Sequence, residues 1–453
     1  MSKITNHHKR GNRLKYFGLF AVLNILVILL VVKILSSKPV LKPRVTYHGP
    51  NPITMRREME SESVLGKSAP GQRKKIGKIT PTAQSPTPTI PKPTPTGLPP
   101  TPTIQPQLPT PIPSLNKGEY GIAAGGGLTY LGQTDLDLYF NNLQSLGVKW
   151  VRWDIDWSVI QSNGVSDFRW EETDRVAATA KKYGINSLGI ITYTPKWARD
   201  SVCVDKFSCQ PADPKVFAVF AGKVALRYKD LIIYWEIWNE PNVPNFWTPK
   251  PNVMKYFDIL REAYWEVKKN NPQSIILSGG LAPSGDEADG SISPFTFMSA
   301  LYTAGANQYF DAVALHPYTY PISPDYQASW NHWKDLVSVH QIMVDNGDVA
   351  KKIWITEFGA ATGGPGVPFP TNQPSGFKYN YDFMTEGAQY DMLVEATTYY
   401  VQNTDWMGPF FWYSLHDNGT SKETPENFFG LLRYDWSKKP AYDTYRNAIL
   451  AGQ

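Results

Sequence analysis

The chain has 453 residues, of which 42% are hydrophobic and 13% aromatic, and its formal net charge is +5 at neutral pH. This length fits one large domain with appendages or two domains, because an α/β barrel alone takes about 250 residues or more. Much of the positive charge comes from lysines and arginines up to Lys78, where no apolar core pattern is evident. We therefore expect no nucleic-acid partner.

The first segment with a clear pattern is an apolar run at residues 16–35, long enough to cross a bilayer as one helix. Five basic residues precede it, and the positive-inside tendency places residues 1–15 in the cytoplasm and the rest of the chain outside. The alternative is a cleaved signal peptide, whose apolar core is usually only about 7 to 15 residues long and is followed by a small-x-small site. Residues 36–39 match such a site poorly. We predict a single-pass anchor in the cytoplasmic membrane, with the folded domain outside the cell.

Residues 36–117 have few aromatics and no sustained apolar periodicity, and they contain a dense Pro/Thr repeat from Pro81 to Pro113. Such a composition cannot bury a core, and it favours extended polyproline-like conformations of about 3 Å per residue. We predict a disordered stalk. A partner-binding segment or a glycosylated region would have the same composition.

Residues 118–453 alternate short β-rich runs with longer amphipathic ones, which indicates repeated βα units around a parallel sheet. Eight strands are predicted, at residues 120–124, 150–154, 186–192, 232–239, 274–279, 310–316, 353–358 and 409–414. Helices are predicted among other places at residues 134–146, 171–183, 214–228, 253–270 and 386–403, with a last one after residue 439. Eight strands close a barrel, whereas an open doubly wound sheet more often has about six. The predicted fold class is α/β: a (β/α)8 TIM barrel preceded by one transmembrane helix and a disordered Pro/Thr-rich stalk.

The two cysteines of the chain, Cys203 and Cys209, lie in one polar stretch. A metal site would need more ligands nearby; outside the cytoplasm the pair is compatible with a disulfide that closes a small loop, and the sequence does not decide whether it forms. Two free thiols are the alternative. The sequence also shows no nucleotide-binding loop, no His-Glu metal cluster and no Gly-x-Ser-x-Gly elbow. We expect neither a metal nor a cofactor.

Two glutamates stand at the ends of predicted strands. Glu240 follows the fourth strand in the run Trp-Asn-Glu-Pro-Asn (238–242), and Glu357 ends the seventh in Ile-Trp-Ile-Thr-Glu-Phe-Gly (353–359). The carboxyl ends of barrel strands meet in one bowl, so both side chains should point into the same cavity. Retaining glycoside hydrolysis needs two carboxyls about 5 to 5.5 Å apart. Either glutamate alone would be ambiguous.

Together these segments resemble those of the clan of retaining (β/α)8 glycoside hydrolases. Residues 238–242 with Phe246-Trp247 are similar to family 39, and residues 356–359 to the cellulase-like family 5; the likeness covers about residues 120–450. The resemblance implies that Glu240 is the acid/base and Glu357 the nucleophile. The spacing itself does not say which is which.

The resemblance also implies five substrate-binding residues. It places Arg152 on the second strand, where a guanidinium would lower the pKa of the nucleophile, and Asn239 against the sugar 2-hydroxyl. It places His316 and Tyr318 beside the nucleophile and Trp412 under the reacting sugar as a floor. The alternative for each is an ordinary structural role in the barrel.

Several further positions are weaker candidates. Trp197 and Trp247 could line neighbouring subsites. Glu236, deeper in the fourth strand, is interpreted as a buried, paired structural carboxylate. Asp154 and Asp156 could bind sugar hydroxyls, but a solvated loop is the favoured interpretation.

The sequence therefore predicts a retaining glycosidase that hydrolyses O-glycosyl bonds of a β-linked polysaccharide or oligosaccharide by double displacement, and that acts as a monomer. Transglycosylation remains open, since another sugar can take the place of water. A catalytically silent carbohydrate-binding barrel tethered to the cell surface is one alternative. An envelope assembly protein that interacts through its stalk is another.

Overall fold

The computed structural model describes residues 118–328, 330–369 and 382–451. The predicted cytoplasmic tail, membrane helix and stalk, residues 1–117, lie outside these ranges and stay predictions. Within the described ranges, no helix combines the length and the apolar character that crossing a bilayer requires.

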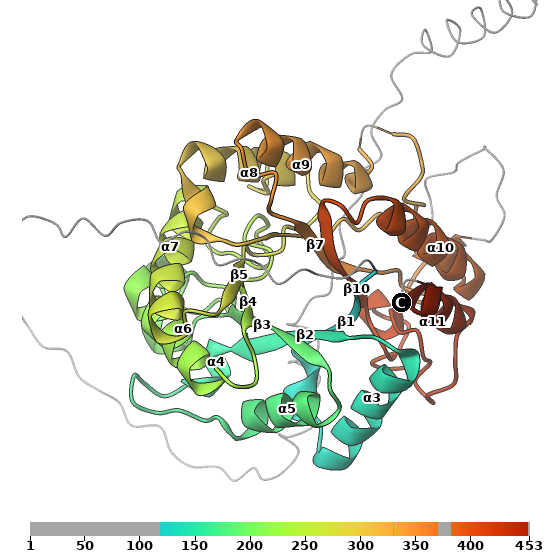
Figure 1. The fold of residues 1–453 in the computed structure, drawn as a ribbon, viewed down its shortest axis with the longest axis horizontal. Coiled ribbons are helices and arrows are strands. Elements are labelled where there is room, and N and C mark those ends of the chain that lie inside the picture. The colour runs from blue at the N-terminus through green and yellow to red at the C-terminus, as the bar shows by residue number, and fades with distance from the viewer. Residues whose placement is uncertain (1–117, 329, 370–381, 452–453) are drawn as a thin grey trace, which may run out of the picture. The chain divides into compact units, whose positions relative to one another are not determined.

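Eight parallel strands form the centre of the fold (Figure 1). They are β1 (Tyr120–Gly125), β2 (Trp150–Asp156), β3 (Asn186–Thr192), β4 (Tyr234–Ile237), β5 (Ile275–Leu277), β6 (Val313–Leu315), β7 (Ile353–Phe358) and β10 (Met407–Tyr413). Their order in the sheet is β5-β4-β3-β2-β1-β10-β7-β6. Isolated parallel bridges, Leu277 to Ala312 and Leu281 to Leu315, join the two outer strands. The predicted barrel and all eight of its strands are confirmed.

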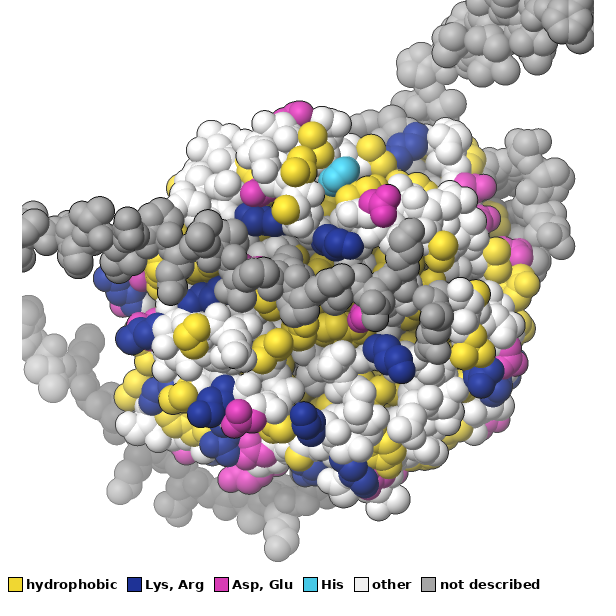
Figure 2. Space-filling view, viewed as in Figure 1, with side chains coloured by type: hydrophobic (Ala, Val, Ile, Leu, Met, Phe, Trp, Pro, Cys, Tyr) yellow, Lys and Arg dark blue, Asp and Glu magenta, His cyan; other side chains and the backbone are white. Residues whose placement is uncertain are grey.

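Helices surround the barrel (Figure 1). They are α3 (Gln133–Leu146), α4 (Trp157–Ile160), α5 (Glu171–Lys182), α6 (Pro214–Arg227), α7 (Val253–Asn270), α8 (Pro294–Thr303), α9 (Asp335–Asp345), α10 (Glu386–Gln402) and α11 (Pro440–Ala451). The helices predicted by residue range correspond to α3, α5, α6, α7, α10 and α11. A short two-stranded sheet, β8 (Pro368–Phe369) with β9 (Phe383–Met384), precedes α10. On the face drawn in Figure 2, basic and acidic side chains are interspersed.

Local chemistry fixes where the helices begin. The side chains of Asp213, Asn252 and Thr385 accept hydrogen bonds from backbone N–H groups in the first turns of α6, α7 and α10. Such N-caps satisfy donors that a helix cannot pair internally. The chain leaves α3 at Gly147, whose φ of 94° suits a residue without a Cβ. These signals place the loops that carry the site at the ends of the strands.

A layer of aromatic side chains, Trp150, Trp354 and Phe411, fills the barrel interior. The Trp150 ring lies 5.3 Å from the Trp354 ring and 6.4 Å from the Phe411 ring, centroid to centroid. Gly121 pairs with both Trp150 and Phe411 in the sheet. A Cβ on Gly121 would lie 2.6 Å from Phe411 Cδ1 and 2.8 Å from Trp150 Cβ. The glycine therefore makes room for rings that support the strand ends.

The disulfide between Cys203 and Cys209 is present. It closes a loop that packs on the segment after β4, because Gln210 N–H donates to the Thr248 carbonyl and Thr248 N–H to the Ser208 carbonyl. Of the two alternatives that the sequence left open, a loop-closing bond and two free thiols, the structure has the bond.

We expect Gly121→Ala to lower the free energy of unfolding by about 1 to 3 kcal/mol, because the added methyl group overpacks the aromatic layer. Gly132→Ala is the comparison variant, since no atom lies within 4 Å of its Cβ position and its φ is −65°; it adds a methyl group without overpacking and costs only the N-cap preference of α3 for glycine over alanine. Thermal unfolding of both variants would test this. Equal midpoints for the two variants would show that the layer can yield without cost.

Candidate active site

The site begins where β4 ends early. The strand was predicted to continue to residue 239, but it stops at Ile237 because Trp238 and Glu240 have φ of 72° and 48°. Residues other than glycine rarely adopt this left-handed backbone conformation, and those that do cluster at functional sites. The turn is fixed from both sides: Glu240 N–H donates to the Gly280 carbonyl at 2.9 Å, and the Trp238 indole to the Phe246 carbonyl at 2.9 Å.

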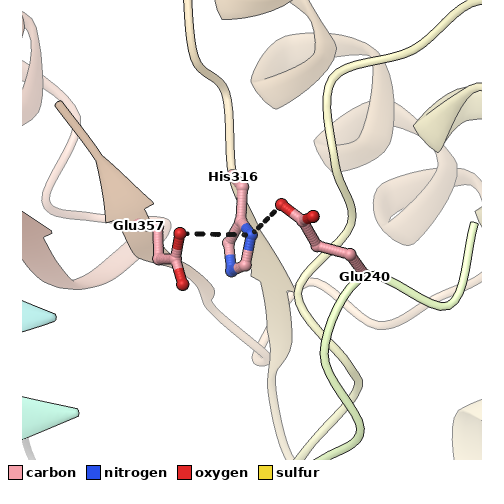
Figure 3. A group of neighbouring side chains, drawn as sticks. All are labelled: Glu240, His316 and Glu357. Atoms are coloured by element: carbon pink, nitrogen blue, oxygen red, sulfur yellow. Dashed lines mark hydrogen bonds and ion pairs between the residues drawn. The ribbon is translucent and has the colours of Figure 1, made fainter. Parts of the chain in front are cut away.

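The barrel brings Glu240 and Glu357 together. One oxygen of each carboxylate and a ring nitrogen of His316 all lie within 4.8 Å of one another (Figure 3). Their exposed fractions are 1% for Glu240 and 4% for Glu357. These glutamates are 117 positions apart in the sequence (357 − 240), yet the barrel buries them side by side at a spacing compatible with a retaining mechanism.

Arg152 is the centre of a fully buried ionic network. Its Nη1 donates to Glu357, its Nε and Nη2 donate to Glu236 at 2.7 and 2.9 Å, and Nη2 also donates to Asn239 Oδ1 at 2.8 Å. Burial disfavours the charged guanidinium, but the Glu236 and Glu357 carboxylates outweigh this and raise the pKa of Arg152. Glu236 is thus the buried, paired carboxylate that the sequence suggested. From β4 it holds the guanidinium of Arg152 in place beside Glu357 of β7.

Glu357 receives a donor on each oxygen. Arg152 donates to Oε1, and the Tyr318 hydroxyl donates to Oε2 at 2.8 Å. Burial raises the pKa of Glu357, while Arg152 and Tyr318 act to lower it. Arg152 therefore acts on the pKa of Glu357 in the expected direction, while the loss of solvent is the larger contribution and acts in the opposite direction.

Glu240 pairs with a side chain that can reverse its role. His316 Nδ1 lies 2.8 Å from Glu240 Oε1, and its Nε2 lies 3.0 Å from the Thr356 hydroxyl. Burial and the charge of Arg152 hold the pKa of His316 well below its usual value, so the imidazole is neutral. A neutral imidazole has one donor and one acceptor nitrogen. It can donate to a Glu240 carboxylate or accept from a Glu240 carboxylic acid, and the Thr356 hydroxyl can complement either state.

Trp412 points away from the two glutamates, toward α11, which corrects the expectation that it forms the floor under the sugar. It pairs in register with Ile122 and Phe358, is fully buried, and has its ring 6.5 Å from that of Tyr445 on α11. The next residue, Tyr413, pairs with Ala123, which pairs with Arg152. Because strand side chains alternate between faces, Tyr413 takes the inward position.

The two weaker tryptophan candidates, Trp197 and Trp247, differ in their exposure to solvent. Trp247 is fully buried against Trp238 and Tyr256, so it offers no face to a ligand. Trp197 is 38% exposed and lines an apolar pocket with Val216 and Phe220 of α6. Neither belongs to the group around the two glutamates described above.

Asp154 was expected in a solvated loop, but it lies within β2 and is only 8% exposed. It follows Arg152 by two positions, so both side chains face the barrel interior. Burial raises the pKa of Asp154 to about 7; Arg152 opposes this, and Asp156, Glu357 and Glu236 add to it. Asp156 instead caps α4, where it accepts from Val159 N–H. The sequence signal that could have placed Asp154 inside the barrel is its spacing of two residues from Arg152, which puts both side chains on the same face of the strand.

Two carboxylates and an imidazole could also be considered as metal ligands. However, both oxygens of Glu357 already accept hydrogen bonds, and a cation there would face the buried Arg152 guanidinium. Both His316 nitrogens are engaged as well. This donor set favours proton transfer over metal coordination.

Comparisons with known proteins identify the fold. No protein family's sequence profile matches the chain, and no curated protein sequence does. Among solved structures, a family 39 glycoside hydrolase from the gut symbiont Bacteroides cellulosilyticus WH2 is similar at 21% identity and a TM-score of 0.58, over 74% of this chain and 64% of that one. A monomeric beta-xylosidase from Caulobacter crescentus CB15 is similar at 15% identity and a TM-score of 0.54, over 73% of this chain and 67% of that one. GH5_18 from Streptomyces cattleya is similar at 14% identity and a TM-score of 0.55, over 74% of this chain and 81% of that one.

The chain thus spans less than two thirds of the length of the family 39 structure. At these identities the similarity establishes the fold. The likeness to family 39 and family 5 barrels that the motifs suggested is confirmed at that level.

We expect Asp154→Asn to stabilise the protein increasingly from pH 4 to pH 7. The pKa of Asp154 is raised from 3.8 to about 7, so ionisation above pH 4 costs the folded state free energy that asparagine does not lose. The gain should approach at most about 4 kcal/mol above pH 7, since one pKa unit corresponds to about 1.4 kcal/mol. Thermal unfolding at several pH values, with the exposed Asp230→Asn as control, measures it. A difference that is constant with pH would contradict this assignment.

Proposed function

We propose that this protein is a retaining glycoside hydrolase that acts on β-linked oligosaccharides or polysaccharides by double displacement. The observation that carries the proposal is the buried pair Glu240 and Glu357, with one carboxylate oxygen of each within 4.8 Å of the other. The pair has two different hydrogen-bonding environments. Two nearby carboxyls in different environments are what acid/base and nucleophile roles require.

The environments favour Glu357 as the nucleophile. Arg152 and Tyr318 place a donor on each of its oxygens, which stabilises the carboxylate and leaves no good position for a proton. Glu240 pairs with neutral His316, which can donate or accept. Glu240 can therefore gain and lose a proton without losing its partner, as a general acid and base must.

In the first step a Glu357 oxygen attacks the anomeric carbon while the bond to the glycosidic oxygen breaks. Glu240 gives its proton to that oxygen, and a glycosyl ester forms on Glu357. In the second step Glu240 takes a proton from water, the water oxygen attacks the anomeric carbon, and the Glu357 carboxylate is released. Arg152 stays ion-paired to Glu236 throughout, so its donor needs no reorganisation as the charge on Glu357 changes.

Two further residues suit sugar binding. The Asn239 carbonyl oxygen is occupied by Arg152, so its amide N–H groups are the ones available to a sugar hydroxyl. Tyr413 holds the inward position at the end of β10, where an aromatic ring can pack on a pyranose. The similar structure from Caulobacter is named as a beta-xylosidase, which supports a β-linked substrate here.

The proposal extends to cellular location. A single-pass anchor in the cytoplasmic membrane and a stalk would hold the barrel outside the cell, and the Cys203–Cys209 disulfide supports an oxidising compartment. Water or a second sugar can resolve the glycosyl ester. A purely binding barrel is disfavoured, because a buried carboxylate pair is costly to maintain and pure binding does not need one.

We expect Glu357→Gln to reduce hydrolysis by about a thousandfold or more, because no glycosyl ester can form. The full-length chain would be assayed on 4-nitrophenyl β-glycosides and β-linked polysaccharides, with the exposed Glu423→Gln as control. Glu240→Ala should lose activity on the polysaccharides but still react with a 2,4-dinitrophenyl glycoside, whose leaving group needs no proton. Azide should then accelerate turnover, since it attacks without a base. Undiminished hydrolysis by both variants would remove the mechanism.

We expect Tyr318→Phe to lower kcat/KM by about 10- to 100-fold, the value of a hydrogen bond to a charged group. The lost donor held the pKa of Glu357 down, so the acidic limb of the pH profile should also move to higher pH. Tyr434→Phe, which changes a 55% exposed ring, serves as the control. An unshifted acidic limb would indicate that Tyr318 only packs.

A further inference from the structure

The mechanism leaves one buried carboxyl group unused. Asp154 lies on the inner face of β2, beside the Arg152 and Glu357 pair, and pairs in register with Ile190 of β3. It has an exposed fraction of 8%. Within the described residues, no donor forms a hydrogen bond or ion pair with its oxygens. A carboxyl group that is more than nine-tenths buried and has no protein partner is expected to have a ligand.

The loop after β1 places Asp154 in one corner with Tyr413. A Cβ on Gly126 would lie 3.2 Å from Asp154 Oδ2, and a Cβ on Gly125 would lie 3.9 Å from Tyr413 Cε2. The backbone at these two consecutive glycines thus packs on the side chains of Asp154 and Tyr413. The charge of Asp154 also acts on Tyr413 and on Glu357. The corner therefore lies within electrostatic reach of the nucleophile, on the side where the sugar that becomes attached to Glu357 would sit.

The charges in this corner are unbalanced. Among the described residues, Arg152 is the one charged partner of Glu236 and Glu357, because His316, whose Nδ1 lies 3.9 Å from Glu357 Oε2, is neutral, and no cation contacts Asp154. Four of the five Arg152 N–H groups donate to Glu236, Glu357 and Asn239. A negatively charged sugar would find acidic neighbours and an arginine already engaged.

We propose that Asp154 is the hydroxyl acceptor of the sugar subsite beside Glu357, and that it restricts this subsite to uncharged pyranosides and excludes uronic acids. The inference rests on the proposed glycosidase function and adds the class of substrate. A carboxylate accepts two hydrogen bonds side by side, which matches two neighbouring hydroxyls of a sugar ring.

The raised pKa of Asp154 supports this assignment. With a pKa of about 7, the group is partly protonated at neutral pH before substrate binds. Hydroxyl donors stabilise its ionised form, whereas a uronate carboxylate would oppose it. The charged groups that act on Asp154 are Arg152, Asp156, Glu357 and Glu236.

The test measures kcat/KM of the full-length chain on 4-nitrophenyl β-D-glucoside, xyloside and galactoside and on the corresponding β-D-glucuronide. We expect wild type to prefer the best neutral glycoside by about a hundredfold or more. Asp154→Asn should lower activity on that glycoside by about 10- to 100-fold. It should narrow the preference over the glucuronide by about tenfold, because one repelling charge is gone. Asp230→Asn should change neither value.

The outcomes separate this inference from the function on which it rests. An active wild type that prefers the glucuronide, or whose preference is the same in Asp154→Asn, overturns the assignment of Asp154 alone. A wild type that neither hydrolyses nor binds any of the glycosides overturns both. If Asp154→Asn does not fold, deoxy analogues of the best glycoside decide the matter on wild type: removing one hydroxyl must cost about tenfold or more, and no loss for any position overturns the proposal.

Discussion

The site depends on one buried arginine. Arg152 has no contact with water, so its charge is tolerable only because Glu236, Glu357 and Asn239 occupy its N–H groups. These partners come from β4, β7 and the turn after β4, so satisfying the guanidinium also fixes those strand ends relative to β2. The same interactions place the nucleophile candidate at a set distance from Glu240. The interactions that make the buried arginine stable are therefore the same ones that position the nucleophile candidate.

Chemically identical side chains acquire different roles through their hydrogen-bond partners. Glu357 faces two donors, whereas Glu240 faces neutral His316, which can donate or accept. Burial acts on both glutamates, so loss of solvent alone cannot divide the roles between them. The proposed division of labour follows from the fixed donors of Arg152 and Tyr318 on one side and the adaptable imidazole on the other.

Two errors of the sequence interpretation share one cause. Trp412 was placed under the sugar and Asp154 in a solvated loop, but a strand turns successive side chains to opposite faces. Trp412 therefore faces α11 and Tyr413 the barrel interior, while Asp154 shares the inner face with Arg152. The tightly wound turn at Trp238 and Glu240 was likewise not evident, since positive φ at a bulky residue is imposed by its surroundings and not by local preference.

The sequence by itself determined the eight strands and the helices α3, α5, α6, α7, α10 and α11, because alternating and helical apolar periods are local signals. It also determined that Glu240 and Glu357 end strands four and seven, which in a closed barrel brings them to one mouth. Only the tertiary structure decided which donors face each carboxylate, which of Trp412 and Tyr413 points inward, and that burial outweighs Arg152 at Glu357. Those properties arise from contacts between residues distant in the chain, and no local pattern encodes the field or the solvent exclusion that such contacts create.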